Sequence, residues 1–313
     1  MTRIALVGAG VIGSSWSFVF ARAGLDVFVH DAVPGSAVKA LDFVRSALSD
    51  LEAQGLASTE SPDAILARIK PTSRLEDALE AADYVQESAP ERVEVQRELY
   101  ARLDSLAPPD TILASSTSGL PASAFTQGLA QRRRCLVVHP INPPHLIPLV
   151  EIVPAPWTDP DIVERATDLM RRVGQSPIRL RGEINGFVVN RLQSALLAEA
   201  FRLVEDGVVT ADEVDRAVSD GLGLRWFFMG PFKTIDLNAK TGIAEYCRNL
   251  GAMYHGLAKE QADPRPWGPE LVETIERQLR DSTPSMTISE QQAWRDRCLA
   301  KLTHLKEAGA LAM

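Results

Sequence analysis

The chain has 313 residues, enough for two domains that each bury a core of their own. Its 45% hydrophobic and 24% charged residues are typical of a globular protein, and its net charge of −8 disfavours nucleic acid or an anionic membrane as a partner. Three cysteines without a CxxC pair argue against a zinc site and a disulfide framework, so no metal is expected. Neither a secretion signal nor an apolar run of about 20 residues is visible, which predicts a cytoplasmic protein.

Short apolar runs alternate with helical patterns in the first half of the chain. Ile4–Val7 is apolar throughout, as in a strand buried on both faces of a parallel sheet. Helices are predicted from Val11 to about Gly24, over Val93–Leu106 and over Ile162–Val173. The other predicted strands are Val27–His30, Tyr84–Gln86, Thr111–Ala114, Leu136–Val138, Val150–Val153 and Ile178–Leu180. This alternation predicts a doubly wound α/β Rossmann domain with a mainly parallel sheet over residues 1–183.

The pattern changes after about Arg181. Phe187–Val204 has apolar positions at helical spacing, and Gly207 offers a stop for that helix. Thr210 with Glu213 forms a capping-box pattern for the next helix. No convincing strand pattern follows. Residues 184–313 are therefore predicted to form an all-α second domain.

A glycine-rich turn follows the first strand. Gly8 permits the tight turn, Gly10 lets the backbone approach a pyrophosphate, and Gly13 lets helix and strand pack closely. The helix start that follows supplies unpaired N–H groups and a positive dipole end. The expected contacts to a dinucleotide are therefore made by Gly8, Gly10, Val11, Ile12 and Gly13.

An acidic residue, Asp31, ends the second strand. Its carboxylate suits the adenosine ribose hydroxyls and would repel a 2′-phosphate, and the next residues, Ala32 and Val33, are not basic. NAD is therefore the expected cofactor rather than NADP. FAD is a rival for the same fingerprint, although no second flavin-binding segment is identifiable.

Polar residues follow the later strands. Ser118 comes after the strand Thr111–Ala114 and His139 ends the strand Leu136–Val138, where side chains face the cofactor crevice of a parallel sheet. Glu151 lies inside an apolar stretch, where a lone carboxylate is costly, so His139 is its natural partner. Such a pair suits alcohol oxidation, with the imidazole as the base. Taken singly, His139 is also compatible with a structural hydrogen-bonding role and Ser118 with a helix cap.

Together these residues resemble the 3-hydroxyacyl-CoA dehydrogenase superfamily over essentially the whole chain. The shared motifs are Gly8–Gly13, Ser116–Ser118, His139–Pro143, Pro148–Glu151 and Gly186–Arg191. Within the superfamily the chain is most similar to the λ-crystallin, or L-gulonate 3-dehydrogenase, branch. The stretches that carry this likeness are His139–Pro154, Asn190–Gln193 and Gly221–Arg225.

The resemblance implies roles for individual residues. It makes His139 the catalytic base and Glu151 its partner, while Ser118 and Asn190 bind the substrate oxygen. Asn142 would adjoin the nicotinamide carboxamide or the substrate, and Ser118 would also adjoin the cofactor.

The resemblance also places Glu91 near the nicotinamide ribose. A basic residue is expected five positions later, but the chain has Gln96 there, followed by Arg97, which weakens any claim to a basic contact with the cofactor. A homodimer formed largely through the helical domain is implied as well.

Arg225 discriminates between substrates. Acyl-CoA members are not expected to have arginine here, and a guanidinium matches a carboxylate bidentately, although Arg225 is also compatible with a structural or surface role. We therefore expect NAD-dependent oxidation of a 3-hydroxy acid, above all L-gulonate to 3-dehydro-L-gulonate. The alternatives are L-3-hydroxyacyl-CoA dehydrogenation, carnitine dehydrogenation and, in a different class, a non-catalytic NAD(H)-binding or structural protein.

Overall fold

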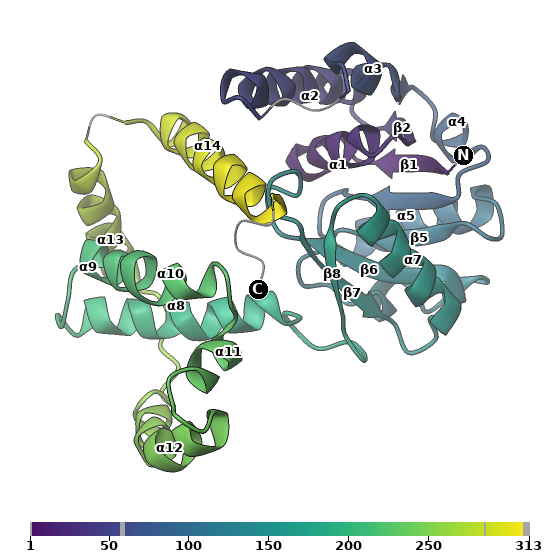
Figure 1. Ribbon diagram of the computed structural model, residues 1–313. Helices are drawn as coiled ribbons and strands as arrows, with labels where there is room; N and C mark the ends of the chain where they lie inside the picture. Colours follow the sequence, from purple (N-terminus) through teal and green to yellow (C-terminus); the bar gives the residue numbers. More distant parts are fainter. Residues whose placement is uncertain (1, 57–59, 285, 309–313) are drawn as a thin grey trace. The chain divides into compact units, whose positions relative to one another are not determined.

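The computed structural model describes residues 2–56, 60–284 and 286–308. The chain divides into two compact units (Figure 1). Met1–Arg191 and Trp294–His304 form the first, called the α/β unit below. Leu192–Ala293 and Leu305–Met313 form the second, called the helical unit.

The α/β unit is built on one eight-stranded sheet, counted over the described residues, with the order β3-β2-β1-β4-β5-β6-β7-β8. The strands are β1 (Arg3–Val7), β2 (Asp26–His30), β3 (Ile69–Thr72), β4 (Tyr84–Glu87), β5 (Ile112–Ser115), β6 (Cys135–Pro140), β7 (Leu149–Pro154) and β8 (Ser176–Arg179). Neighbouring strands from β3 to β6 are parallel, whereas β7 returns antiparallel to β6. This order confirms the doubly wound, mainly parallel sheet.

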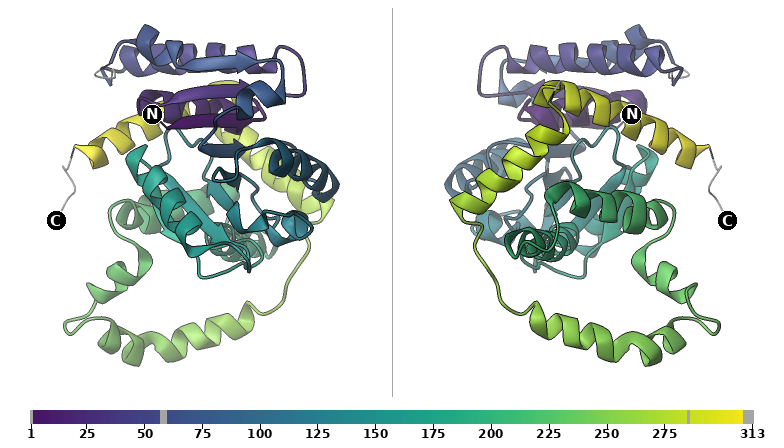
Figure 2. Two further views of the ribbon diagram at one scale, coloured as in Figure 1. Left: turned by 90° about the vertical axis from the view of Figure 1, so that its right-hand side faces the viewer. Right: turned by 90° about the vertical axis from the view of Figure 1, so that its left-hand side faces the viewer.

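Helices cover both faces of this sheet (Figures 1 and 2). Strand residues alternate between two apolar clusters, one shared with α1, α2 and α7 and the other with α4, α5 and α6. The helices of this part are α1 (Val11–Arg22), α2 (Ser36–Ala53), α3 (Pro62–Ala67), α4 (Leu75–Leu79), α5 (Val93–Leu106), α6 (Ser123–Thr126), the 3₁₀ turn η1 (Arg132–Arg134) and α7 (Pro160–Arg172). Burial on both faces explains why central strands such as β1 and β5 are rich in apolar residues.

After β8 the described residues form helices, which confirms the predicted all-α second part of the fold. These are α8 (Val189–Glu205), α9 (Ala211–Arg216), the π-helical η2 (Ala217–Leu222), α10 (Gly223–Trp226), α11 (Pro231–Asp236), α12 (Ile243–Glu260), α13 (Pro269–Ser282) and α14 (Ile288–Glu307). The predicted capping box is present, since Thr210 Oγ1 accepts from Glu213 N and Glu213 accepts from Thr210 N. Within the described chain no helix is long and apolar enough to cross a membrane.

Two features of the α/β unit lie outside the sequence expectations. The edge strand β3 was not predicted because its sequence, IKPT, holds a lysine and a proline, which an edge position tolerates. The middle of α14, Trp294–His304, belongs to this unit, and the Thr303 hydroxyl donates to the carbonyl of Leu146 at 2.7 Å.

Candidate active site

The glycine-rich turn joins β1 to α1 with the expected tight geometry. Gly8 has φ +101°, and a Cβ there would lie 2.6 Å from the carbonyl oxygen of Ser88. A Cβ on Gly13 would lie 1.8 Å from the carbonyl oxygen of Gly8, so α1 packs directly on the turn. In contrast, a Cβ on Gly10 would meet nothing within 4 Å, and no side chain caps the start of α1. This open approach to a helix N-terminus fits a dinucleotide pyrophosphate.

Asp31 follows β2 and braces this turn. Its Oδ2 accepts from the backbone N–H of Ala9 at 2.6 Å, and its Oδ1 accepts from Val33 N at 2.7 Å. Each oxygen keeps a second lone pair, so the carboxylate can also accept a ribose hydroxyl. The structure thus places Asp31 beside the glycine turn.

His139 and Glu151 are direct neighbours across the antiparallel pair of β6 and β7. His139 Nδ1 lies 2.7 Å from Glu151 Oε2, and both side chains are buried. Glu151 Oε1 also accepts from the N–H groups of Val188 and Val189, at 2.7 and 3.1 Å. Burial raises the pKa of Glu151, but hydrogen bonds from His139, Val188 and Val189 outweigh it and leave that pKa below its usual value. The pair that the sequence predicts is therefore formed, with an ionised carboxylate.

Ser118 and Asn190 are also brought together. The side-chain amide of Asn190 donates to the carbonyl oxygen of Ser118 at 2.8 Å. Over the described ranges the Ser118 hydroxyl has no hydrogen-bond partner of its own, and the residue is exposed. Asn142, in the loop after β6, is exposed too.

Glu91 holds the loop that carries Ser118. Its Oε1 accepts from Thr117 Oγ1 at 2.5 Å, Gly119 N at 2.7 Å and Leu120 N at 3.1 Å, and its Oε2 accepts from Ser118 N at 3.1 Å. Burial raises the pKa of Glu91, yet these four donors bring it below the ordinary value. The structure therefore shows that Glu91 braces this loop, whereas its contact with the nicotinamide ribose stays a prediction.

Sequence reasoning missed a second buried carboxyl group, Glu87, at the end of β4. It accepts from Ser115 Oγ at 2.6 Å, Gln96 Nε2 at 3.0 Å and the N–H of Ala89. Burial raises the pKa of Glu87 from 4.5 to about 7, against these hydrogen bonds. Gln96, which stands where the resemblance expects a basic residue, is thus a partner of Glu87. The sequence signal that could have identified Glu87 is an acidic residue at the end of a buried strand.

Arg225 lies on α10 of the helical unit. Its side chain is exposed, and among the described residues it forms no ion pair. Its backbone carbonyl accepts from Met229 N at 3.1 Å. Both residues of this hydrogen bond belong to the helical unit.

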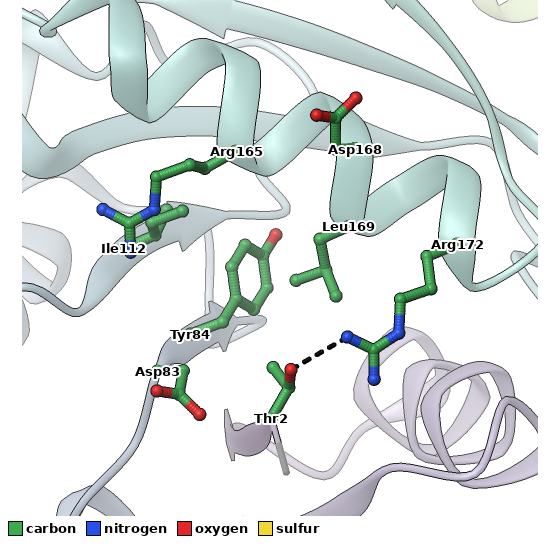
Figure 3. Close-up of a pocket in the computed structure, with 8 residues that line it drawn as sticks. All are labelled: Thr2, Asp83, Tyr84, Ile112, Arg165, Asp168, Leu169 and Arg172. Carbon is green, nitrogen blue, oxygen red and sulfur yellow. Dashed lines mark hydrogen bonds between the residues drawn. The ribbon is translucent and has the colours of Figure 1, made fainter.

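A cavity of about 690 Å³ lies at the amino-terminal ends of the central strands β1, β4 and β5 (Figure 3). Its lining includes Thr2, Tyr84 and, from α7, Arg165 and Arg172. Arg172 donates to Thr2 Oγ1 at 3.0 Å, as Figure 3 shows. None of the predicted site residues lines this cavity, since those follow the carboxyl ends of the parallel strands.

Comparison with known families gives the class of protein. Residues 3–184 match the model for the NAD-binding domain of 3-hydroxyacyl-CoA dehydrogenase, and residues 186–281 match the model for its C-terminal domain. The fold, the glycine turn and these matches define an NAD-dependent dehydrogenase that acts on a hydroxyl group. The chain belongs to the 3-hydroxyacyl-CoA dehydrogenase family. The resemblance seen in the sequence and the expectation of NAD are thereby confirmed.

Three proteins illustrate which relatives and solved structures this chain resembles. A lambda-crystallin homolog of Bos taurus is 43% identical over 306 residues, covering 97% of this chain and 95% of the relative. An L-carnitine dehydrogenase of a Pseudomonas species is 38% identical over 301 residues, covering 93% and 90%. A solved structure of an NAD⁺-dependent dismutase, 5-formyl-3-hydroxy-2-methylpyridine 4-carboxylic acid 5-dehydrogenase, has a TM-score of 0.81 at 28% identity and covers 99% of each chain.

Proposed function

We propose that the protein oxidises the 3-hydroxyl group of a small hydroxy carboxylic acid, with L-gulonate as the first candidate and 3-dehydro-L-gulonate as its product. The observation that carries this proposal is the buried pair of His139 and Glu151, whose Nδ1 and Oε2 atoms are 2.7 Å apart. His139 lies near the carboxyl end of β6, and the glycine turn follows the carboxyl end of β1. An imidazole held in this way is suited to removing a hydroxyl proton.

The pair defines which nitrogen acts. Glu151 accepts a hydrogen bond at Nδ1 of His139, so that nitrogen carries the proton of the neutral ring and Nε2 keeps its lone pair. Nε2 takes the proton of the substrate hydroxyl as the carbonyl forms, and the Glu151 carboxylate stabilises the resulting imidazolium. NAD, when bound, supplies the nicotinamide carbon that accepts the hydride from the same substrate carbon.

Ser118 and Asn190 orient the reacting oxygen in this proposal. The Ser118 hydroxyl, which has no hydrogen-bond partner among the described residues, can donate to that oxygen. Glu91 keeps the Ser118 loop in place through four hydrogen bonds. The Asn190 amide, which donates to the Ser118 carbonyl, ties the start of α8 to the same loop. Asn142 is proposed to contact the nicotinamide carboxamide or the substrate.

A free carboxylate on the substrate would give Arg225 its role. The guanidinium is exposed and has no ion pair over the part of the chain that the structure describes. L-gulonate and L-carnitine are both 3-hydroxy acids with a free carboxylate, and the similar dismutase is named for a carboxylic acid. These likenesses support carnitine as the second candidate. An acyl thioester has no carboxylate next to the reacting hydroxyl, which places L-3-hydroxyacyl-CoA behind both acids.

The substrate is tested by following NADH absorbance with L-gulonate, L-carnitine and L-3-hydroxybutyryl-CoA in parallel, each with NAD and with NADP. We expect turnover with a free hydroxy acid and NAD. Turnover of the CoA ester alone would overturn the proposal. NADH binding without turnover of any of the three would favour the non-catalytic alternative.

Arg225→Met tests the carboxylate contact. A charged hydrogen bond contributes about 1.5–3 kcal/mol, so KM for the hydroxy acid should rise roughly 10- to 100-fold while kcat changes little. Arg248→Met is the matched control, because Arg248 is exposed in the same unit and has no ion pair among the described residues. Equal KM values for the two variants would return Arg225 to a surface role.

We also propose a homodimer formed through the helical unit. Its long helices α8, α12 and α13 have no buried residue in the described chain, and Phe232 and Leu237 of the same unit are 75% and 57% exposed. An amphipathic helix is stabilised mainly by covering its apolar face. A second copy of the chain would supply that cover.

A further inference from the structure

The turn that leads from the α/β unit into α8 has an unusual backbone. Gly186 has φ +72°, and Phe187, which is not a glycine, has φ +49°. A bulky residue in the left-handed region is strained and persists only where its surroundings hold it. The Phe187 ring is fully buried, with its centroid 5.6 Å from that of the His139 ring. The strained turn therefore presses an aromatic side chain against the proposed base.

The same turn delivers two hydrogen-bond donors to Glu151. Val188 is the residue before α8 and Val189 is its first helical residue. Their N–H groups donate to Oε1 of Glu151, while Oε2 of that carboxylate faces His139 Nδ1. The Glu151 carboxylate thus links the His139 imidazole directly to backbone N–H groups at the start of α8.

We propose that the turn Gly186–Val189 is a positioning element for His139, acting through the shared carboxylate of Glu151 and the ring of Phe187. This inference rests on the proposed function, in which His139 is the base. It gives the segment that enters the helical unit a task in the reaction besides connecting the two units.

The electrostatic consequence has a definite sign. Each N–H that donates to Glu151 stabilises its negative charge and leaves less of that charge to favour the imidazolium of His139. Removing one donor should therefore make the imidazolium more stable. In the described residues Glu151 is the one charged side chain within 4.0 Å of the His139 ring nitrogens, so other ion pairs do not obscure this effect. The Phe187 ring limits rotation of the imidazole and contributes no charge.

Val189→Pro removes one of the two donors with little cost to the helix, because proline is favoured at the first helical position. Val189→Ala is the matched control, since it shortens the same side chain and keeps the N–H group. The chain has five histidines, so the His139 ring can be followed by NMR with ¹³C-labelled histidine and assigned by loss of its signal in His139→Gln.

Because the second donor to Glu151 is lost, we expect the titration midpoint of the His139 ring to be higher in Val189→Pro than in Val189→Ala. Glu151→Gln should lower it by about one pH unit or more, which calibrates the coupling. Equal midpoints in Val189→Pro and Val189→Ala would overturn the proposal. A merely structural role would lower the melting temperature without moving the midpoint.

A second variant guards against misfolding of the proline form. Replacing Val189 by its α-hydroxy acid turns the peptide N–H into an ester oxygen and leaves the side chain intact, and it should shift the midpoint in the same direction. These titrations need no substrate. Unchanged midpoints would therefore refute the positioning role alone, whereas full turnover by His139→Gln would refute the proposed function.

Discussion

The two units of the molecule differ in how they are held together. In the α/β unit, two apolar clusters fill both faces of the sheet, and most residues of the strands β1, β4, β5, β6 and β7 are buried. In the described part of the helical unit, Ala211 and Thr234 are the buried residues, with 7% and 5% of their surface exposed. Within that unit α8 is joined to the end of α12, where Arg202 donates to the carbonyl oxygen of Glu260 at 3.3 Å.

This difference in packing decides which unit can hold side chains in a fixed geometry. A close-packed interior fixes side chains in single rotamers. Side chains near the carboxyl ends of the strands can therefore keep constant hydrogen-bond distances and angles. His139 and Glu151 lie on two neighbouring strands of that interior. A unit without a core of its own gains stability when another surface covers its apolar faces. The scarcity of buried side chains in the described helical unit is therefore the basis of the proposed dimer.

The first expected effect is on cofactor binding, at the glycine turn of the α/β unit. Gly13→Ala places a Cβ against the carbonyl oxygen of Gly8, which must push α1 away from β1. NADH affinity, measured by fluorescence titration, should fall about 100-fold, equivalent to about 2.7 kcal/mol. Gly128→Ala is the control, because a Cβ there meets nothing within 4 Å. An unchanged NADH affinity in Gly13→Ala would contradict the packing described for α1.

The next effect addresses the apolar surface of the helical unit. Phe232→Asp puts a charge on a side chain that is 75% exposed in the single chain. If a second copy covers it, the dimer dissociation constant should rise at least about 100-fold, as for a buried aromatic anchor. Light scattering coupled to gel filtration measures the mass, with Lys240→Asp as an exposed control. A wild-type protein that is monomeric at micromolar concentration would remove the proposed dimer.

A pH effect is expected inside the α/β unit. Because burial raises the pKa of Glu87 from 4.5 to about 7, its folded form holds a proton that the unfolded form has released between those values. The stability that this proton confers is complete below pH 4.5 and is lost as pH rises through 7. Glu87→Gln should abolish that loss, of the order of 3 kcal/mol, in urea titrations at pH 5 and pH 8. Identical pH dependence in the two proteins would show that Glu87 is ionised throughout.

The smallest effect compares helix caps in the two units. Thr210→Ala removes the capping box of α9 in the helical unit, which should cost about 1 kcal/mol of unfolding free energy. Ser61→Ala removes a cap of α3 in the α/β unit that lacks the reciprocal bond, and about 0.5 kcal/mol is expected. Urea unfolding measures both. A larger loss for Ser61→Ala would contradict this ranking.

Much of the fold was predictable because its signals are local. Buried strands and the glycine turn occupy consecutive residues, and β1, β2 and α5 lie close to their predicted ranges. The pairing of His139 with Glu151 was predictable because a carboxylate inside an apolar strand needs a partner. The edge strand β3 was missed because an edge position demands little of the sequence.

The remaining features depend on tertiary contacts. The left-handed backbone of Phe187 follows from its packing on His139, which no local propensity encodes. The pairing of Glu87 with Gln96 joins the end of β4 to α5, and Gln96 read by itself is an ordinary helical residue. The return of Trp294–His304 to the α/β unit also has no local signature. Residues with strained backbone or remote partners are thus the ones that sequence reasoning missed.

The central claim is that His139, held by Glu151, removes the substrate proton. The most direct test is His139→Gln, in which turnover of the hydroxy acid and binding of NADH are measured on the same preparation. His255→Gln, an exposed histidine of the helical unit, is the control. If His139 is the base, kcat falls by about 10²- to 10⁴-fold in His139→Gln while the NADH dissociation constant stays within about twofold. Retention of wild-type kcat by His139→Gln would contradict it.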